Sequence, residues 1–246
     1  MFDPCVVIPV YNHEHAIGKV VAQVAQHGLP CILVDDGSSP SCAAVLDALV
    51  ADYPGQVVLE RHAVNQGKGG AVLTGFARAG RDGYSHVLQV DADGQHSVGD
   101  IPRFLDAARA APQAVIAGCP VYDESVPALR LYARYLTHVW VWINTLSLAI
   151  RDSMCGFRVY PLAPVAALAA RRRLGLRMNF DIEILVRLYW DGLAVVNLPT
   201  RVGYPDDGVS HFKAWADNVL ITRLHVALFF GMLPRIPRLL ARSWRN

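Results

Sequence analysis

Short apolar runs alternate with amphipathic stretches through the first half of the chain. The runs are rich in Val, Ile, Leu and Cys and occupy residues 5–10, 31–34, 57–61 and 86–90. Between them, apolar residues recur at helical spacing over residues 16–26, 41–51 and 69–79. Short strands that alternate with helices of this length indicate βαβ units and a mostly parallel sheet. The pattern therefore predicts an α/β fold.

The second half of the chain has a weaker pattern. We expect strands at 114–118 and 195–198 and helices at 129–150 and 179–190. The last thirty or so residues are typical of helices broken at Pro234 and Pro237. We therefore expect one α/β domain over residues 1–213 and a C-terminal amphipathic helical segment over residues 214–246.

The length and composition set limits on the class of protein. A chain of 246 residues suits one α/β domain with a short appendage. With 53% hydrophobic and 18% charged residues, it should bury a sizeable core and still expose apolar surface. The longest apolar runs, 136–150 and 224–234, are shorter than the roughly 18–20 residues that span a bilayer. The sequence thus predicts no transmembrane helix and no signal peptide.

Charge and cysteine content narrow the location and the partners. The formal net charge is +2 and no basic stripe dominates the chain, which argues against a dedicated nucleic-acid binder. The five cysteines form no C-x-x-C pair, which is typical of reduced thiols in the cytoplasm.

The candidate chemistry centres on residues 91–96, which follow the fourth apolar run and read Asp-Ala-Asp-Gly-Gln-His. Asp91 and Asp93 can meet one hard cation from a tight turn, with the amide of Gln95 as a further oxygen ligand. Mg²⁺ and Mn²⁺ prefer such ligands and keep positions open for phosphates. A calcium loop does not fit, because His96 and Pro102 stand where that loop needs Gly and Glu. A plain acidic turn remains open from these residues alone.

Two further motifs follow predicted strands. Asp36 lies in an Asp-Asp-Gly-Ser sequence after the second run, where a carboxylate can accept from an N–H of a nucleotide base; Asp-Gly is equally typical of a β-turn. Residues 65–70 form a glycine-rich entry to a helix that contains Lys68. They match neither the P-loop nor the dinucleotide fingerprint. Both anion binding at a helix start and simple helix capping remain open.

Five motifs stand in series along the chain. They are VIPVYN at 7–12, DDGS at 35–38, NQGKG at 65–69, DADGQH at 91–96 and DSMCGFR at 152–158. Together they resemble the family 2 glycosyltransferases of the GT-A fold, and within that family the dolichyl- or polyprenyl-phosphate sugar transferase branch. The resemblance covers roughly residues 5–210. One departure is His13, which separates Asn12 from Glu14, so the expected acidic contact to the base is assigned to Glu14.

The resemblance implies a Rossmann-like, mostly parallel sheet flanked by helices. It also implies a donor site in which the nucleoside lies against Pro9, Tyr11, Glu14 and Asp36. Asp91, Asp93 and Gln95 would hold Mg²⁺ or Mn²⁺ on the diphosphate, near Lys68. Transfer in this family is a single in-line displacement with inversion. Asp93 would contribute to catalysis by holding the metal that stabilises the leaving diphosphate. Asp152 is the candidate base if the acceptor is a hydroxyl.

The acceptor side is assigned to basic residues. Arg130, Arg134 and His138 fall at i, i+4 and i+8 on one face of the predicted 129–150 helix. This face suits a lipid phosphate above an apolar tail, and arginines that merely snorkel over apolar neighbours are as consistent with it. Arg158 and Lys213 are further candidates for phosphate contact.

The C-terminal segment has an uneven charge pattern. Residues 218–246 contain no Asp or Glu, and a helical projection places Arg235, Arg238, Arg242 and Arg245 on one side. Such a helix is typical of binding to an anionic membrane surface, and a helix docked on its own domain is the alternative.

We therefore expect a metal-dependent, inverting glycosyltransferase that moves a sugar from a UDP- or GDP-sugar to a polyprenyl phosphate. Its predicted location is peripheral, on the inner face of the cytoplasmic membrane. Transfer to a hydroxyl of another lipid or apolar metabolite is an alternative. A nucleotidyltransferase is a weaker one, because it would need a Gly- and Arg-containing loop where residues 11–14 stand. A catalytically silent binding protein that kept the fold is the remaining alternative.

Overall fold

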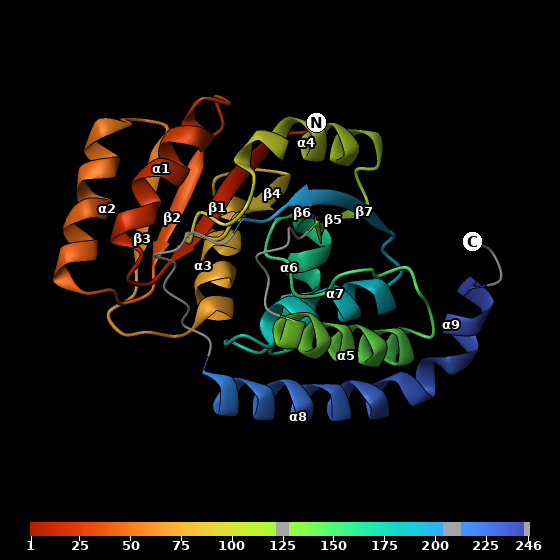
Figure 1. The fold of residues 1–246 in the computed structure, drawn as a ribbon. Coiled ribbons are helices and arrows are strands. Elements are labelled where there is room, and N and C mark those ends of the chain that lie inside the picture. The colour runs from red at the N-terminus through yellow and green to blue at the C-terminus, as the bar shows by residue number, and fades with distance from the viewer. Residues whose placement is uncertain (122–127, 204–212, 244–246) are drawn as a thin grey trace.

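A seven-stranded sheet forms the centre of the molecule, with helices on both faces (Figure 1). The computed structural model describes residues 1–121, 128–203 and 213–243. The strand order across the sheet is β3-β2-β1-β4-β6-β5-β7. The strands are β1 (Pro4–Val10), β2 (Cys31–Asp35), β3 (Val57–Arg61), β4 (His86–Gln89), β5 (Val115–Val121), β6 (Arg158–Pro161) and β7 (Val195–Arg201).

The sheet is parallel except around β6. β1 pairs in parallel with β2 and β4, β2 with β3, and β5 with β7, whereas β6 runs antiparallel to both β4 and β5. The six runs predicted as strands are all present, and the mostly parallel α/β fold is confirmed. The prediction missed β6, because its four residues show no alternation that separates a strand from a loop.

The helices connect the strands and extend the chain at its C terminus. They are α1 (Glu14–Ala25), α2 (Pro40–Asp52), α3 (Lys68–Arg81), α4 (Ile101–Ala110), α5 (Ala128–Thr145), α6 (Leu162–Arg171), α7 (Phe180–Trp190), α8 (Ala214–Met232) and α9 (Ile236–Ser243), with 3-10 turns at Val98–Asp100 and Leu233–Arg235. The predicted long helix ends at Thr145, five residues early. α4 and α6 were not predicted.

Side chains of the sheet fill two cores, one on each face. Val6 and Ile8 of β1 point into the core that α1 and α4 cover, where they join Phe104. The alternate residue Val7 lies in the other core, beneath α3. This alternation follows from the two-residue period of a strand, and it leaves the carboxyl ends of the central strands open to carry a site.

The long helix α8 lies beneath α5 at the side of the molecule away from α1 and α2 (Figure 1). Its inner side chains, such as Leu224 and Leu228, belong to the same core as α3 and α7. The stretch Trp215–Arg242, 28 residues long, is helical and apolar enough to cross a membrane by length and composition. Length and composition do not separate a spanning helix from one that lies on a surface, so the expectation of no transmembrane helix stays a prediction.

Two arginines of the C-terminal segment contact the domain, as in the docked-helix alternative. Arg242 donates to the backbone carbonyls of Tyr189 and Leu193, at 2.6 Å each. Arg235 places its guanidinium 4.8 Å from the ring centroid of Trp190. These two arginines therefore hold the C-terminal segment on the domain, and Arg238 stays exposed. The prediction for Arg245 lies outside the described residues.

Candidate active site

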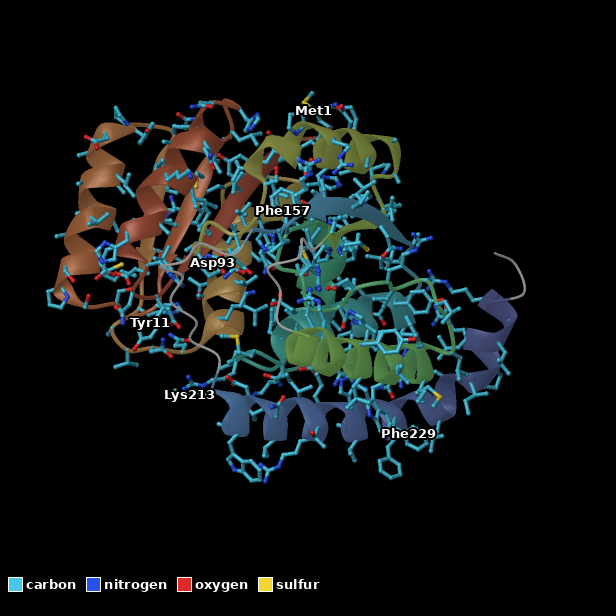
Figure 2. The ribbon with its side chains drawn as sticks, viewed as in Figure 1. Met1, Tyr11, Asp93, Phe157, Lys213 and Phe229 are labelled. Atoms are coloured by element: carbon cyan, nitrogen blue, oxygen red, sulfur yellow. The ribbon has the colours of Figure 1, made fainter. Side chains whose placement is uncertain are left out.

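The acidic loop after β4 lies at the carboxyl ends of the parallel strands. Figure 2 shows Asp93, in this loop, on the same side of the molecule as Tyr11, which follows β1. The loop turns at Gly94, whose φ is +71°, and the Asp93 carboxylate accepts a 3.0 Å hydrogen bond from the Gln95 backbone N–H. A left-handed residue at this point suits glycine. The turn therefore brings Asp91, Asp93 and Gln95 to one short loop, as predicted.

The two carboxylate oxygens of Asp91 differ: one has polar partners and the other has none in the part of the chain that the structure describes. Its Oδ2 lies 2.9 Å from the Lys68 ammonium and 3.6 Å from His96 Nε2. Its Oδ1 is buried and has no hydrogen-bond partner in the described structure. Burial alone would raise the pKa of Asp91, but Lys68 and His96 lower it well below its usual range. Asp91 is therefore an anion, with one oxygen free to accept a ligand.

Gly156 allows this position of Asp91. A Cβ atom on residue 156 would stand 2.2 Å from Asp91 Oδ2, far inside van der Waals contact. The glycine of the DSMCGFR motif is thus required for the close approach of its backbone to the acidic loop.

The donor set fits a divalent cation that also binds phosphates. Within the described ranges, no group of three or more His, Cys, Asp or Glu side chains is arranged to hold a metal ion by itself. Mg²⁺ bound through one or two carboxylates together with substrate phosphates does not need such a cage. The unpartnered Oδ1 of Asp91 is the observation that fits a cation in this loop.

Lys68 lies between two carboxylates. It is the first residue of α3, and its ammonium is 2.8 Å from Asp181 Oδ2 as well as 2.9 Å from Asp91 Oδ2. Burial opposes the charge, but the two aspartates outweigh it and raise the pKa of Lys68 above its usual value. Lys68 is therefore a fixed cation beside the predicted metal loop.

Asp181 was not among the residues predicted for the site. One signal was available: Asp181 and Glu183 both lie in the first turn of an otherwise mostly apolar helix. Charged side chains in such a setting need partners. Asp181 has three in the structure, namely Lys68, the Gln89 amide at 3.1 Å and, through its backbone carbonyl, Arg158 at 2.7 Å.

The prediction that Arg158 contacts an acceptor phosphate needs correction. Arg158 is 0% exposed and donates to Tyr160 Oη and to the Asp181 carbonyl. Burial opposes the charge, but Tyr160 and Asp181 outweigh it, so the pKa of Arg158 is raised. The guanidinium therefore contacts the start of α7 from the interior and is not exposed at the surface.

The residues predicted for the nucleoside pocket gather at the ends of β1 and β2. Pro9, Tyr11 and Glu14 are half-buried around the end of β1 and the start of α1. The loops after β1 and β2 are tied together, because Ser39 N–H donates to the Asn12 side chain at 2.7 Å. The structure thus brings the predicted nucleoside residues into one neighbourhood.

Asp36 has a role that the sequence did not reveal. Its two carboxylate oxygens accept from the backbone N–H groups of Gln66 and Gly67, each at 2.8 Å, and one of them also lies 2.8 Å from His62 Nδ1. Asp36 therefore anchors the glycine-rich loop and so places Lys68 at the start of α3.

A second ionic cluster surrounds Asp152. Arg134 donates two hydrogen bonds of 2.7 Å to its carboxylate, and His138 Nε2 lies 3.3 Å away. The backbone N–H groups of Met154 and Cys155 donate to Oδ1. Burial would raise the pKa of Asp152, but Arg134 and His138 lower it well below its usual range.

This geometry favours a positioning role for Asp152 over removal of a proton. Both carboxylate oxygens are engaged, and a carboxylate with a depressed pKa is a weak base.

Two of the three residues predicted to share a face of α5 lie beside Asp152. They are Arg134 and His138, which are half-buried and buried. The side chain of Arg130 lies outside the described residues. Lys213 caps α8 through its backbone N–H, which donates to Asp217 at 2.7 Å, and its side chain is exposed.

A mostly parallel sheet flanked by helices, with an acidic loop at its carboxyl edge, is the arrangement of the GT-A fold. Residues 5–168 match the family model described as Glycosyl transferase family 2, and the chain belongs to this family.

Curated relatives span most of the chain. It is 29% identical over 247 residues to the polyprenol monophosphomannose synthase of Mycolicibacterium smegmatis, covering 95% of this chain and 88% of that protein. It is 31% identical over 230 residues to the UDP-N-acetylglucosamine–dolichyl-phosphate N-acetylglucosaminyltransferase of Methanococcus voltae, covering 87% and 90%. These similarities confirm the resemblance to the polyprenyl-phosphate branch and the assignment as a glycosyltransferase.

A solved structure confirms the fold. Glucosyl-3-phosphoglycerate synthase from Mycobacterium tuberculosis, in complex with Mn²⁺, uridine-diphosphate-glucose and phosphoglyceric acid, superposes with a TM-score of 0.69. The match has 14% identity and covers 94% of this chain and 79% of that one.

Proposed function

We propose that this protein transfers a sugar from a UDP- or GDP-sugar to a polyprenyl phosphate, with inversion at the anomeric carbon and with Mg²⁺ or Mn²⁺ bound at the acidic loop. The observation that carries the proposal is the unpartnered Oδ1 of Asp91, beside the Lys68 ammonium, at the carboxyl edge of the sheet. The names of the relatives support a lipid-phosphate acceptor.

The donor end of the reaction would use residues of the acidic loop and the neighbouring loops. Asp91, Asp93 and Gln95 would hold the cation, which would stabilise the leaving nucleoside diphosphate. Pro9, Tyr11 and Glu14 would line the nucleoside pocket; Asp36, also assigned there, fixes the loop that leads to Lys68. At the start of α3, Lys68 adds positive charge where the backbone N–H groups of a helix already favour an anion.

The acceptor end would use the cluster on α5. Asp152 orients Arg134 and His138, and these two side chains would position the acceptor phosphate, together with Arg130 and Lys213. One phosphate oxygen forms a bond to the anomeric carbon while the bond from that carbon to the diphosphate oxygen breaks. The diphosphate leaves with the bonding electrons. A phosphate acceptor is already anionic and needs no general base.

The apolar tail of such an acceptor would need an apolar surface near this cluster. On α5, the exposed side chains Tyr135, Leu136 and Trp140 follow Arg134 along the helix. On α8, Trp215 and Phe230 are 85% and 64% exposed, and Figure 2 shows side chains projecting from the outer face of this helix. Contiguous exposed apolar surface is typical of a binding face. We infer that the exposed apolar side chains of α5 and α8 contact the inner side of the cytoplasmic membrane.

The acceptor assignment is tested by a choice between two lipids. Purified protein with Mn²⁺ receives a panel of labelled UDP- and GDP-sugars, first in a thermal-shift screen, because a bound donor raises apparent stability. The stabilising donor is then offered with a polyprenyl phosphate or with the matching polyprenol. Label in the lipid phase is expected only with the phosphate. Transfer to the polyprenol alone would establish the hydroxyl alternative, and no donor binding at all would contradict the proposed function.

A further inference from the structure

The Lys68 ammonium is shared between two aspartates, only one of which belongs to the predicted metal site. Its distances to Asp91 Oδ2 and Asp181 Oδ2 are 2.9 and 2.8 Å. The three side chains are largely removed from solvent, with exposed fractions of 18% for Lys68, 19% for Asp91 and 6% for Asp181. In so sheltered a place, charges interact more strongly than at a surface.

Asp181 is fixed in place by groups other than Lys68. The Gln89 amide donates to its Oδ1 at 3.1 Å, and Arg158 donates to its backbone carbonyl at 2.7 Å. Asp181 also lies in the first turn of α7, where the helix dipole favours negative charge. Its position is therefore fixed by contacts that do not involve the acidic loop.

An ammonium paired with a metal-binding carboxylate opposes the arrival of a divalent cation, because like charges repel. If Lys68 had Asp91 as its only anionic partner, its charge would neutralise the carboxylate that the cation needs. Asp181 supplies a second negative charge beside the same ammonium, so the three side chains together keep an excess of negative charge, and Asp91 keeps an unpartnered Oδ1.

We propose that Asp181 is a positioning residue for the cation site: it holds and neutralises Lys68 so that Asp91 can bind a divalent cation beside that lysine. The inference rests on the proposed function, in which the cation binds at Asp91. Asp181 itself is not a ligand of the cation in this proposal, and its effect passes through Lys68.

The test measures Mn²⁺ binding without nucleotide, through the loss of the electron paramagnetic resonance signal of free Mn²⁺ in full-length protein. Asp181→Asn keeps the oxygen that accepts from Gln89 and removes the charge. It is expected to weaken Mn²⁺ binding about tenfold, since an opposite charge at this range shifts a neighbouring equilibrium by that order. Lys68→Met is expected to tighten Mn²⁺ binding, because it removes the competing ammonium.

The double variant separates an indirect effect from a direct one. In the Lys68→Met background, Asp181→Asn is expected to change the Mn²⁺ dissociation constant by less than about twofold, as in a double-mutant cycle in which one residue acts through the other. If Asp181→Asn lowers Mn²⁺ affinity equally in the unmodified protein and in Lys68→Met, Asp181 acts on the cation itself. If it does not lower Mn²⁺ affinity in the unmodified protein, Asp181 has no effect on the site. Either result overturns the proposal.

Controls keep the outcome interpretable. Asp191→Asn removes a carboxylate from a surface pair with Arg171 and should leave Mn²⁺ binding unchanged. Thermal unfolding confirms that each variant is folded at the assay temperature; if Asp181→Asn is not, Lys68→Met alone decides, and unchanged or weaker Mn²⁺ binding by it overturns the proposal. Absence of Mn²⁺ binding by the unmodified protein, or unchanged binding by Asp91→Asn, would instead contradict the cation site of the proposed function.

Discussion

At position 156, a side chain larger than that of glycine would collide with the Asp91 carboxylate of the acidic loop. Gly156→Ala would place a Cβ atom 2.2 Å from Asp91 Oδ2, so the carboxylate or the backbone must move. We expect the variant to lose Mn²⁺-dependent donor binding and to unfold with a free energy lower by about 1–3 kcal/mol, as overpacking does. Isothermal titration with the donor and chemical denaturation measure the two effects.

A matched glycine controls this prediction. Gly18 lies in α1, and a Cβ atom there would meet nothing within 4 Å. Gly18→Ala should therefore leave donor binding unchanged and stabilise the helix by up to about 1 kcal/mol. Equal donor binding by Gly156→Ala and the unmodified protein would show that Asp91 tolerates displacement.

Asp93 is the second carboxylate of the loop, and its loss should affect chemistry more than stability. Asp93→Ala removes one predicted metal ligand and the 3.0 Å hydrogen bond that Gln95 N–H donates. We expect metal-dependent turnover of the donor to fall by at least about 100-fold, with a stability loss of only about 1 kcal/mol. A coupled assay for released nucleoside diphosphate measures the rate. Asp106→Ala, in an exposed ion pair with Arg109, serves as the control; unchanged turnover by Asp93→Ala would remove the metal assignment.

The residues of the site differ in how far the sequence could reveal them. Asp91, Asp93 and Gln95 stand close together in a recognisable motif, so the local pattern alone is enough to predict that they share one loop after a strand. The pairing of Lys68 with Asp181 joins residues far apart in the chain: the apolar helix around Asp181 indicates that it needs a partner, but not which one. Arg158 shows the opposite error: its place in a motif suggested a ligand contact, but only the packing of β6 shows that the side chain is buried.

Among the elements, α5 is joined to the loop before β6 through the ionic cluster of Asp152. Because the pKa of Asp152 is lowered in the folded state, the carboxylate adds stability above the pKa of an unfolded aspartate, about 3.9. That contribution is lost as the pH falls below about 4. Asp152→Asn should therefore lower the free energy of unfolding clearly at pH 7, and the difference from the unmodified protein should shrink near pH 3.5.

Urea denaturation at the two pH values measures this difference. Asp106→Asn, whose carboxylate is exposed at the surface, is the control and should show little effect at either pH. A difference for Asp152→Asn that stays constant between pH 7 and pH 3.5 would contradict the ionic origin of the stabilisation.

Regular elements were predicted where the hydrophobic period is clear. β1, β2 and β3 are apolar runs bounded by turn residues, and α7 repeats apolar residues over its whole length. β6 could not be found in this way, because its place as an antiparallel strand between β4 and β5 depends on partners distant in sequence. The same limit applies to α9: its charge pattern left a membrane-facing helix and a docked helix open, and only the carbonyls of Tyr189 and Leu193 show that Arg242 contacts the domain.

At the scale of the whole molecule, the exposed face of α8 should decide association with lipid. Phe230 is 64% exposed, so Phe230→Glu removes apolar area without opening the core. Burial of such a side chain contributes about 2 kcal/mol, so we expect vesicle affinity to fall roughly 30-fold. Co-sedimentation with phosphatidylglycerol vesicles measures the loss, while the melting temperature and donor binding should not change.

The control for this prediction is Ala48→Glu, at an exposed position on α2, away from α8. It adds the same charge and should leave vesicle binding unchanged apart from a small electrostatic effect. Equal loss by both variants would indicate simple charge repulsion, and no loss by Phe230→Glu would exclude this face. Truncation of the segment 214–246 is a less clean test, because side chains of α8 and α9 complete the core.

The segment from Asp152 to Gly156 joins the ionic cluster proposed for the acceptor to the loop proposed for the cation. Asp152 fixes Arg134 through its side chain and the backbone of Cys155 through a 2.7 Å hydrogen bond, and the next residue, Gly156, faces Asp91. A lipid phosphate that draws Arg134 away from Asp152 would therefore disturb the neighbour of Asp91. Thermodynamic linkage then requires reciprocity: whatever factor the acceptor imposes on donor affinity, the donor must impose on acceptor affinity.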